Sequence, residues 1–531
     1  MKYRILQKKW FLYLTEFFAG MALMAVELGT SRLIAPYFSS SQIVWTIIIG
    51  TIMIAMALGN VIGGRWADKS TDPGKLFRRI LIAGIWIALI PVLGKYVIAA
   101  ITALVILTVN TAHLIWAALI TCLVLFVYPL FLLGTVTPTL TKLTLQDLGE
   151  SGSVAGRLGA CNTIGSIIGT FLPTFVTIPS VGTSVTFLIF AGILIALALI
   201  YFISTGTHKA ATVAGIVIFL LCCIFGHRSH FAFWENDLTY EGESVYNYLQ
   251  VKDDEQKTIL STNVMFGVQS MYMKQPGFTG MYYDYALAAP VMTGKKTPSV
   301  LILGMGTGTF ATQCDYYFPG CDVSGVEIDG KITELAHTYF HLDEKTPVAT
   351  YDGRAYLNVD QKKYDVIMVD AYQDITIPFQ MSSVEFFTLV RDHLAEGGVM
   401  VMNMNMRGSG GDDDICTYLS DTVTSVFPYA VSVDVPWTTN REMFASLSDP
   451  AAALEAGTAA LADGELKTKM LTVRQDLAAV GKGDHIFTDD CAPVELIGMR
   501  SMDAMIKDEL GYYKDVFETE GLPGLLSLLG L

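Results

Sequence analysis

The feature that most constrains this chain is a series of long apolar segments within residues 10–225. Several approach the roughly 20 residues that a helix needs to cross about 30 Å of hydrocarbon. In lipid such a segment must be helical, because a helix satisfies its own backbone hydrogen bonds. The segments are Trp10–Leu28, Ile43–Gly64, Ile80–Leu93, Tyr96–Val109, Leu114–Leu133, Leu158–Ile178, Val185–Ile203 and Ala211–Phe225. Residues 1–230 are therefore expected to form a transmembrane domain of seven or eight helices.

Basic residues indicate which ends of the first two segments face the cytoplasm, because cytoplasmic loops carry the excess of Lys and Arg. They are Lys2, Arg4, Lys8 and Lys9 before the first segment, and Arg65, Lys69, Lys75, Arg78 and Arg79 after the second. Residues 80–109 can form two short spans, or one span and an interfacial piece. Seven crossings would place the rest of the chain outside the cytoplasm, and eight would place it inside. Residues 63–69 resemble the short loop after the second helix of major-facilitator transporters, so this domain is expected to be transporter-like.

The rest of the chain has the composition of a soluble protein and carries most of the formal charge of −15. An acidic domain gives no electrostatic attraction for nucleic acid, so no nucleic-acid partner is expected. The eight cysteines form no CxxC pair and no Cys/His spacing typical of zinc sites. No metal is therefore expected.

The soluble part begins with a small β-rich leader, residues 231–296, in which Val245–Val251 and Thr258–Ser261 read as short strands. Strands and helices then alternate through residues 297–531, which predicts a parallel sheet with right-handed crossovers. The expected strands are Ser299–Leu303, Asp322–Val326, Thr346–Thr350, Tyr364–Val369 and Val399–Met404. The predicted fold is an α/β Rossmann-type domain, like the class I methyltransferases, joined to a multi-pass α-helical membrane domain.

Candidate site residues follow these strands, at the edge where open α/β sheets bind ligands. They are Gly304, Gly306, Thr307 and Gly308, then Glu327, then Asp352 and Gly353, and finally Asp370. The glycine turn has the spacing GxGxG rather than GxGxxG, which favours an adenosylmethionine-type ligand over NAD. Glu327 can accept hydrogen bonds from both ribose hydroxyls. An α/β fold without such a ligand is the alternative.

In these residues the chain resembles the spermidine synthase (polyamine aminopropyltransferase) family, and more closely its membrane-fused bacterial members. The resemblance covers roughly residues 240–405. It includes an entry strand at residues 243–251 with Asn247 where glutamine is usual, Gln269 after the second strand, and the segment Tyr282-Tyr283-Asp284. It implies that Glu327 binds the ribose, that Asp352 lies beside the adenine, and that Asp370 is the general base. It also implies a substrate pocket formed by Asn247, Gln269, Tyr282, Asp284, Tyr372, Gln373 and Asp374.

Two departures from the family pattern concern carboxylates. Thr307 stands where the family has an aspartate that holds the propylamine of the donor. The second aspartate of the catalytic loop falls at Gln373, with Asp374 one position later. Asp374 or Asp284 could compensate. The donor could instead be S-adenosylmethionine itself, which would make the protein a methyltransferase.

The resemblance implies a membrane-bound transferase that moves an aminopropyl group from decarboxylated S-adenosylmethionine to an amine in polyamine biosynthesis. A methyltransferase acting on a membrane-delivered substrate, and a polyamine transporter or sensor without catalysis, are the alternatives. Decarboxylated S-adenosylmethionine or S-adenosylmethionine is the expected co-substrate. The lipid bilayer and a small-molecule amine are the expected partners, and a homodimer is left open. A multi-pass cell-membrane location is expected. The cytoplasmic side is preferred for the soluble domain, because the nucleotide is made there.

Overall fold

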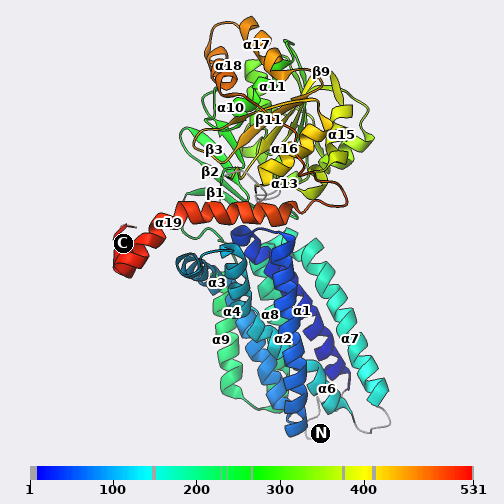
Figure 1. The fold of residues 1–531 in the computed structure, drawn as a ribbon. Helices are drawn as coiled ribbons and strands as arrows, with labels where there is room; N and C mark the ends of the chain where they lie inside the picture. The colour runs from blue at the N-terminus through cyan, green and yellow to red at the C-terminus, as the bar shows by residue number, and fades with distance from the viewer. Residues whose placement is uncertain are drawn as a thin grey trace. The chain divides into compact units, whose positions relative to one another are not determined.

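The computed structural model describes residues 9–145, 151–228, 230–235, 237–264, 267–372, 377–408 and 414–528. The chain divides into two compact units. We call residues 1–236 and 241–248 the helical unit, and residues 237–240 and 249–531 the sheet unit. Each unit is considered by itself below (Figure 1).

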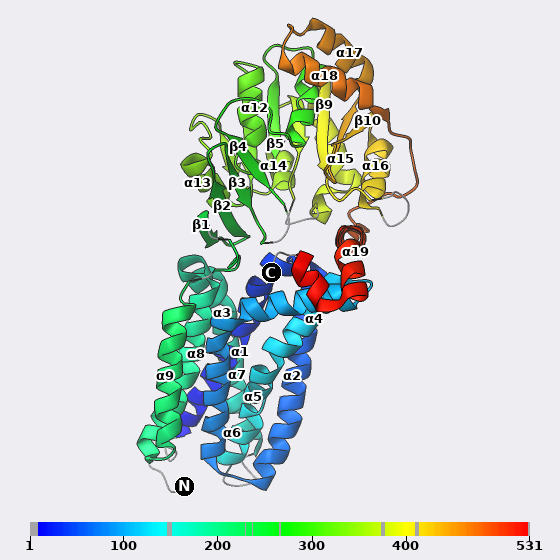
Figure 2. The same cartoon turned by 90° about the vertical axis from the view of Figure 1, so that its left-hand side faces the viewer.

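The helical unit consists of helices that run alongside one another, as both ribbon views show (Figures 1 and 2). They are α1 (Lys9–Phe38), α2 (Gln42–Lys69), α3 (Pro73–Thr108), α4 (His113–Leu125), α5 (Val127–Gly134), α6 (Val136–Thr144), α7 (Ser151–Leu172), the π-helix η2 (Pro173–Thr177), α8 (Ile178–Thr205) and α9 (Lys209–Gly226). Within the described residues, five helices are long and apolar enough to cross a membrane. A sixth is formed if the pair His113–Leu125 and Val127–Thr144, bent by 48°, counts as one span.

The number of membrane crossings depends on the long run from α7 to α8. Residues 80–109, which left the expected count open, lie almost wholly on the single helix α3. The apolar run Ser151–Thr205 counts as one candidate span, but it contains 55 residues. At 1.5 Å per residue such a helix would be about 80 Å long, more than twice the hydrocarbon thickness. It is broken at Gly182, where φ is 81° and ψ is 168°, and α1 packs against both α7 and α8. The expectation of seven or eight crossings stays a prediction.

The contact between α1 and α7 is unusually close because of glycine. A Cβ atom on Gly165 would lie 2.0 Å from the carbonyl oxygen of Phe17, so only glycine allows the two backbones to approach this way. Beside this contact the buried Glu16 accepts hydrogen bonds from Thr137 Oγ1 (2.5 Å) and Asn162 Nδ2 (2.9 Å). This carboxylate joins α1 to α6 and α7.

The sheet unit contains the mixed sheet that carries the candidate site residues. A four-stranded leader sheet has the order β1-β2-β3-β4, and the eight-stranded main sheet has the order β12-β10-β11-β9-β8-β5-β6-β7. The leader strands are β1 (Leu238–Glu243), β2 (Tyr248–Asp253), β3 (Lys257–Ser261) and β4 (Ser270–Met273). The main strands are β5 (Ser299–Leu303), β6 (Asp322–Glu327), β7 (Val348–Thr350), β8 (Tyr364–Val369), β9 (Leu394–Met404), β10 (Tyr429–Asp434), β11 (Arg441–Ser446) and β12 (Ala478–Ala479).

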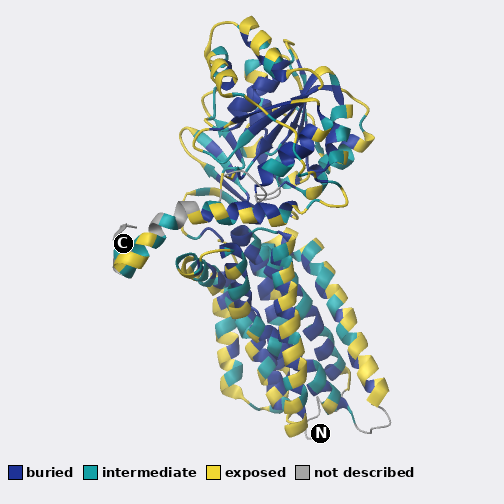
Figure 3. Cartoon of the chain, in the orientation of Figure 1, coloured by how far each residue is buried: buried dark blue, intermediate teal, exposed yellow. Residues whose placement is uncertain are grey.

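Helices cover the main sheet, and its interior is buried (Figure 3). They are α10 (Tyr283–Ala286), α11 (Ala288–Met292), α12 (Thr309–Tyr317), α13 (Gly330–Tyr339), α14 (Gly353–Val359), the 3₁₀ helix η3 (Phe379–Met381), α15 (Val384–Asp392), α16 (Ile415–Val426), α17 (Pro450–Ala460) and α18 (Glu465–Asp476). A further helix, α19 (Val494–Leu528), packs against α16. Strand β8 is buried at every position, as expected for a parallel strand covered on both faces. The predicted Rossmann-type fold is confirmed.

The order of the strands positions the site. Strands β5 to β9 pair in parallel with one another, whereas β11 is antiparallel to β9 and β10 is antiparallel to β11. Chain order reverses at β5, which lies between β6 and β8. In open α/β sheets the crevice at such a reversal is the usual ligand site. Because β11 runs against β9, the loop between β10 and β11 lies at this same edge.

Candidate active site

The glycine turn after β5 brings the backbone close to the neighbouring strand. Gly304 has φ of 89°, and a Cβ there would lie 2.5 Å from the carbonyl oxygen of Asp370. Gly306 and Gly308 also have positive φ values, and Gly308 caps the start of α12. Glycine is therefore needed at position 304, because it tolerates the positive φ and leaves room for the end of β8. The amide of Thr307 donates to Ser270 Oγ (3.1 Å).

Glu327, the last residue of β6, is tied to this turn. Its Oε2 accepts from the amide of Gly306 (2.9 Å) and its Oε1 from the amide of Asp329 (3.0 Å). Burial raises the pKa of Glu327 to about 7, and this effect outweighs the hydrogen bonds from the two amides, which lower the pKa. Each carboxylate oxygen keeps a further lone pair. This arrangement suits acceptance of hydroxyl hydrogen bonds at the edge of the sheet.

Asp352 and Gly353 begin α14, beyond β7. Asp352 caps this helix, with Oδ1 accepting from the amide of Ala355 (2.8 Å). A Cβ on Gly353 would meet the end of the Met381 side chain at 3.2 Å. The observed role of Asp352 is thus a helix cap, and its position beside an adenine stays a prediction.

Asp370 directly follows β8 and is held from two sides. Tyr282 donates its hydroxyl to Oδ2 (2.7 Å) and Asn403 donates Nδ2 to Oδ1 (2.9 Å). Asn440 in turn donates to Oδ1 of Asn403 (2.9 Å). Loss of surrounding water raises the pKa of Asp370 to about 7, although the donors Asn403 and Tyr282 lower it. The carboxylate is therefore fixed in orientation and close to the protonation equilibrium that a base needs at neutral pH.

Tyr372 and Gln269 lie near Asp370, and both are also tied to the backbone. Tyr372 donates its hydroxyl to the carbonyl of Asn403 (2.5 Å) and accepts from the amide of Asn405 (3.0 Å). The carbonyl of Gln269 accepts from the hydroxyl of Tyr283 (2.8 Å). Burial raises the pKa of Tyr372 well above its ordinary value, so this phenol stays neutral. Gln373 and Asp374 lie outside the described residues.

Asp284 is held by four hydrogen bonds from its own chain, and its predicted contact with substrate stays a prediction. Its Oδ1 accepts from the amide and hydroxyl of Thr279 (both 2.8 Å) and from Gln313 Nε2 (2.7 Å), while Oδ2 accepts from the amide of Gly280 (2.7 Å). It does not border the cavity described below. Asn247 belongs to the helical unit, where its amide donates to Ser244 Oγ (2.8 Å).

A cavity of about 560 Å³ opens beside Asp370. Its wall unites four predicted residues, Gln269, Tyr282, Asp370 and Tyr372, with three asparagines that sequence reasoning missed, Asn403, Asn405 and Asn440. The asparagines lie at the end of β9 and before β11. Only the sheet order, with β9 between β8 and β11, reveals that they meet Asp370.

Comparison with known proteins places this architecture in a family. Residues 281–440 match the spermine/spermidine synthase domain. A probable polyamine aminopropyl transferase of Bifidobacterium longum is 51% identical over 346 residues, which cover 62% of this chain and 77% of that protein. A polyamine aminopropyltransferase of Vibrio vulnificus is 27% identical over 39% of this chain and 71% of its own length. The crystal structure of a probable spermidine synthase from Corynebacterium glutamicum aligns with a TM-score of 0.35 and 16% identity, over 47% of this chain and 99% of its own. The identity and coverage of the Bifidobacterium relative show that the chain belongs to the polyamine aminopropyltransferase family.

Proposed function

We propose that the sheet unit transfers an aminopropyl group from decarboxylated S-adenosylmethionine to an amine, with Asp370 as general base. The observation that carries this proposal is the geometry of Asp370. The carboxylate borders the cavity at the point where strand order reverses, and Tyr282 and Asn403 fix its orientation. Such a group can take a proton from an amine that enters the cavity.

The residues of the donor crevice fit an adenosyl ligand. Gly304 and Gly306 form a tight turn, and Glu327 presents a carboxylate beside it. An acid at the end of the second parallel strand is suited to the two ribose hydroxyls. When bound, the donor supplies a sulfonium that makes the neighbouring carbon electrophilic.

The proposed reaction balances with no further reactant. The acceptor arrives as an ammonium ion and gives one proton to the Asp370 carboxylate, which frees the nitrogen lone pair. The nitrogen then bonds to the carbon beside the sulfonium, and the C–S bond breaks with its electron pair going to sulfur. The products are a secondary ammonium ion and a neutral thioether. Tyr282 and Asn403 hold the base in place during the proton transfer.

One observation favours a second candidate, methyl transfer from S-adenosylmethionine. Within the described residues, the buried hydroxyl of Thr307 has no hydrogen-bond partner. A neutral side chain therefore stands where the resemblance expects the acid that binds the propylamine of the donor. A charge-assisted hydrogen bond is about twice as strong as a neutral one.

Mass analysis of the product separates the two functions. The purified full-length chain would be incubated with 1,4-diaminobutane and with each sulfonium donor in turn. We expect an aminopropylated product from decarboxylated S-adenosylmethionine, and a Glu327→Gln variant should weaken binding of both donors. A methylated product from S-adenosylmethionine, with none from the decarboxylated form, would reject aminopropyl transfer.

The pH dependence of kcat/KM tests Asp370 as the base. Activity should rise as pH passes through about 7, because the carboxyl must lose its proton before it can accept one. Asn403→Leu removes a donor that stabilises the carboxylate, so the rise should move to higher pH by about 1 unit. Asn358→Leu, at an exposed position of α14, should leave the profile unchanged. An unshifted pH profile in the Asn403 variant would show that Asn403 does not stabilise the Asp370 carboxylate.

We also propose that the helical unit anchors the enzyme in a lipid bilayer. Cations gather at one end of this unit, namely Lys69, Lys75, Arg78, Arg79 and Lys142. Gly215 packs on Leu81 and Gly226 packs on Val92. The later residue of α9 thus meets the later residue of α3, so the two helices run side by side in the same direction. The chain therefore leaves the helical unit at the end away from these cations. Since cations mark the cytoplasmic end, this path favours a non-cytoplasmic sheet unit, the reverse of the preference based on donor supply.

Labelling of Cys491 measures this sidedness. Cys491 is a free, exposed cysteine of the sheet unit. A membrane-impermeant maleimide should label it on intact cells, and the label at this site should be absent from a Cys491→Ser variant. Labelling of Cys491 only after the cells are permeabilised would instead indicate that the sheet unit lies in the cytoplasm.

A further inference from the structure

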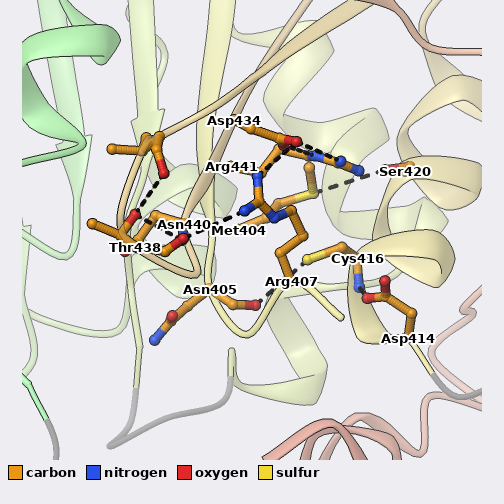
Figure 4. A network of polar contacts seen from close by, with 11 residues as sticks. Met404, Asn405, Arg407, Asp414, Cys416, Ser420, Asp434, Thr438, Asn440 and Arg441 are labelled. Atoms are coloured by element: carbon orange, nitrogen blue, oxygen red, sulfur yellow. Dashed lines mark hydrogen bonds and ion pairs between the residues drawn. The ribbon is translucent and has the colours of Figure 1, made fainter. Parts of the chain in front are cut away.

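A cluster of three charged residues closes the hairpin between β10 and β11 (Figure 4). Asp434, the last residue of β10, lies opposite Arg441, the first residue of β11. The guanidinium group of Arg441 donates Nε (2.6 Å) and Nη2 (3.3 Å) to the two carboxylate oxygens of Asp434. Arg407, three residues after β9, reaches the same carboxylate with Nη1 (2.6 Å). This ion clamp, formed by Arg407, Asp434 and Arg441, therefore joins the end of β10, the start of β11 and the segment after β9.

Hydrogen bonds extend this clamp into the loop between β10 and β11. The amide of Arg407 donates to the carbonyl of Thr439 (2.9 Å), and Thr439 Oγ1 donates to Oδ1 of Asn405 (3.0 Å). Trp437 in this loop has φ of 63°, and Met406 in the segment after β9 has φ of 58°. Such backbone is strained for large side chains, and it persists where the surrounding structure enforces it. The ion clamp and these hydrogen bonds supply that enforcement.

The same loop leads to the proposed base. Asn440, which precedes Arg441, donates Nδ2 to Oδ1 of Asn403, and Asn403 donates Nδ2 to Oδ1 of Asp370, each at 2.9 Å. Because Asn440 occupies the carbonyl side of the Asn403 amide, the NH₂ side is the one turned to Asp370. Both asparagines border the cavity, together with apolar side chains of α19, whereas the three residues of the ion clamp do not. The clamp therefore acts on Asp370 through the residues that it holds.

The ion clamp is stronger than a typical surface ion pair, which adds little because water screens it and the side chains lose freedom. Two guanidinium groups share one carboxylate here, and the double hydrogen bond from Arg441 fixes its geometry. The side chains of Arg407 and Arg441 are only 27% and 30% exposed, which limits screening. Burial raises the pKa of Asp434, but the hydrogen bonds from Arg441 and Arg407 outweigh burial and hold that pKa below its ordinary value. Asp434 is therefore ionised at neutral pH.

We propose that Asp434 is a positioning residue for the reaction. It holds Arg407 and Arg441, and thereby fixes the loop whose Asn440 turns the NH₂ group of Asn403 toward Asp370. Without the clamp the Asn403 amide can rotate, and Asp370 then loses one of the donors that align it with the incoming amine. This proposal rests on the proposed function, because it concerns the alignment of the base.

A double-mutant cycle tests this route in the full-length enzyme, with decarboxylated S-adenosylmethionine and 1,4-diaminobutane as substrates. Asp434→Asn removes the charge but keeps the shape, and it should lower kcat by about tenfold, because a misaligned base loses rate. The KM for the donor should not change, since Glu327 and the glycine turn lie outside the route. In an Asn403→Leu background the route is already broken, so Asp434→Asn should lower kcat no further. Effects that multiply in the double variant would overturn the proposal.

Further variants separate this role from a merely structural one. Asp434→Glu keeps the carboxylate and should restore most of the kcat. Asp463→Asn removes a carboxylate that is 96% exposed and pairs with Lys467, and it should leave kcat unchanged. If Asp434→Asn fails to fold, Arg407→Gln breaks one arm of the clamp, keeps the Arg441 pair, and should lower kcat in the same direction.

A lowered Tm with a wild-type kcat in the folded Asp434→Asn enzyme would also overturn the proposal, as would a Glu variant as slow as the Asn variant. Absence of any aminopropylated product in the wild type would instead reject the proposed function, so the two failures are distinguishable.

Discussion

Replacement of Asp370 by asparagine should lower kcat by about 10²–10⁴-fold, the usual contribution of a positioned general base. The asparagine side chain has nearly the same shape and can still contact Tyr282 and Asn403, but it cannot take a proton from an ammonium ion. The rate of aminopropyl transfer would be measured at saturating donor and amine, at a pH above the rise in activity.

Donor binding provides the control for this variant. Glu327 and the glycine turn are unchanged, so calorimetry should give a donor Kd close to that of the wild type. Retention of more than about a tenth of the wild-type kcat would exclude Asp370 as the base.

Replacement of Asp284 by alanine should destabilise the sheet unit by about 3–5 kcal/mol, because each buried donor left without its acceptor costs about 1 kcal/mol or more. The four donors that now meet this carboxylate, from Thr279, Gly280 and Gln313, would be left without their acceptor. Thermal unfolding in detergent should show a fall in Tm of roughly 10 °C. The Asp284→Asn variant keeps one carbonyl oxygen with two acceptor lone pairs, so its Tm should fall less than that of Asp284→Ala.

The same variant distinguishes the structural role from the substrate role that the resemblance implies. If Asp284 only holds the segment before Tyr282, the folded fraction of the variant should keep its KM for the amine. An unchanged Tm together with a raised KM for the amine would indicate that Asp284 contacts the substrate.

The sheet that holds the donor crevice could be predicted because buried parallel strands are short apolar runs with a distinctive sequence. The strands ending before Gly304 and at Glu327, and the strand before Asp370, were all expected, and the structure contains them. Ligands of open α/β sheets bind at the ends of such strands for a topological reason, so the residues of the proposed donor crevice could be named from the sequence.

The asparagines beside Asp370 could not be predicted in the same way. Asn403, Asn405 and Asn440 meet near Asp370 only because β11 joins the sheet antiparallel to β9. No local pattern specifies which edge of a sheet a later strand will extend. Residues 80–109 were open between two short spans and one span with an interfacial piece, and the structure places them almost wholly on the single helix α3.

Different segments of the sheet unit form the two sides of the proposed site, and this arrangement has an evolutionary consequence. The proposed base and the proposed donor turn follow β5, β6 and β8, whereas part of the cavity beside Asp370 comes from α19, the last helix described. Exchange of that terminal helix between related enzymes could therefore alter which amine is chosen while the group being transferred stays the same. A lineage could diversify its products through changes in a single segment.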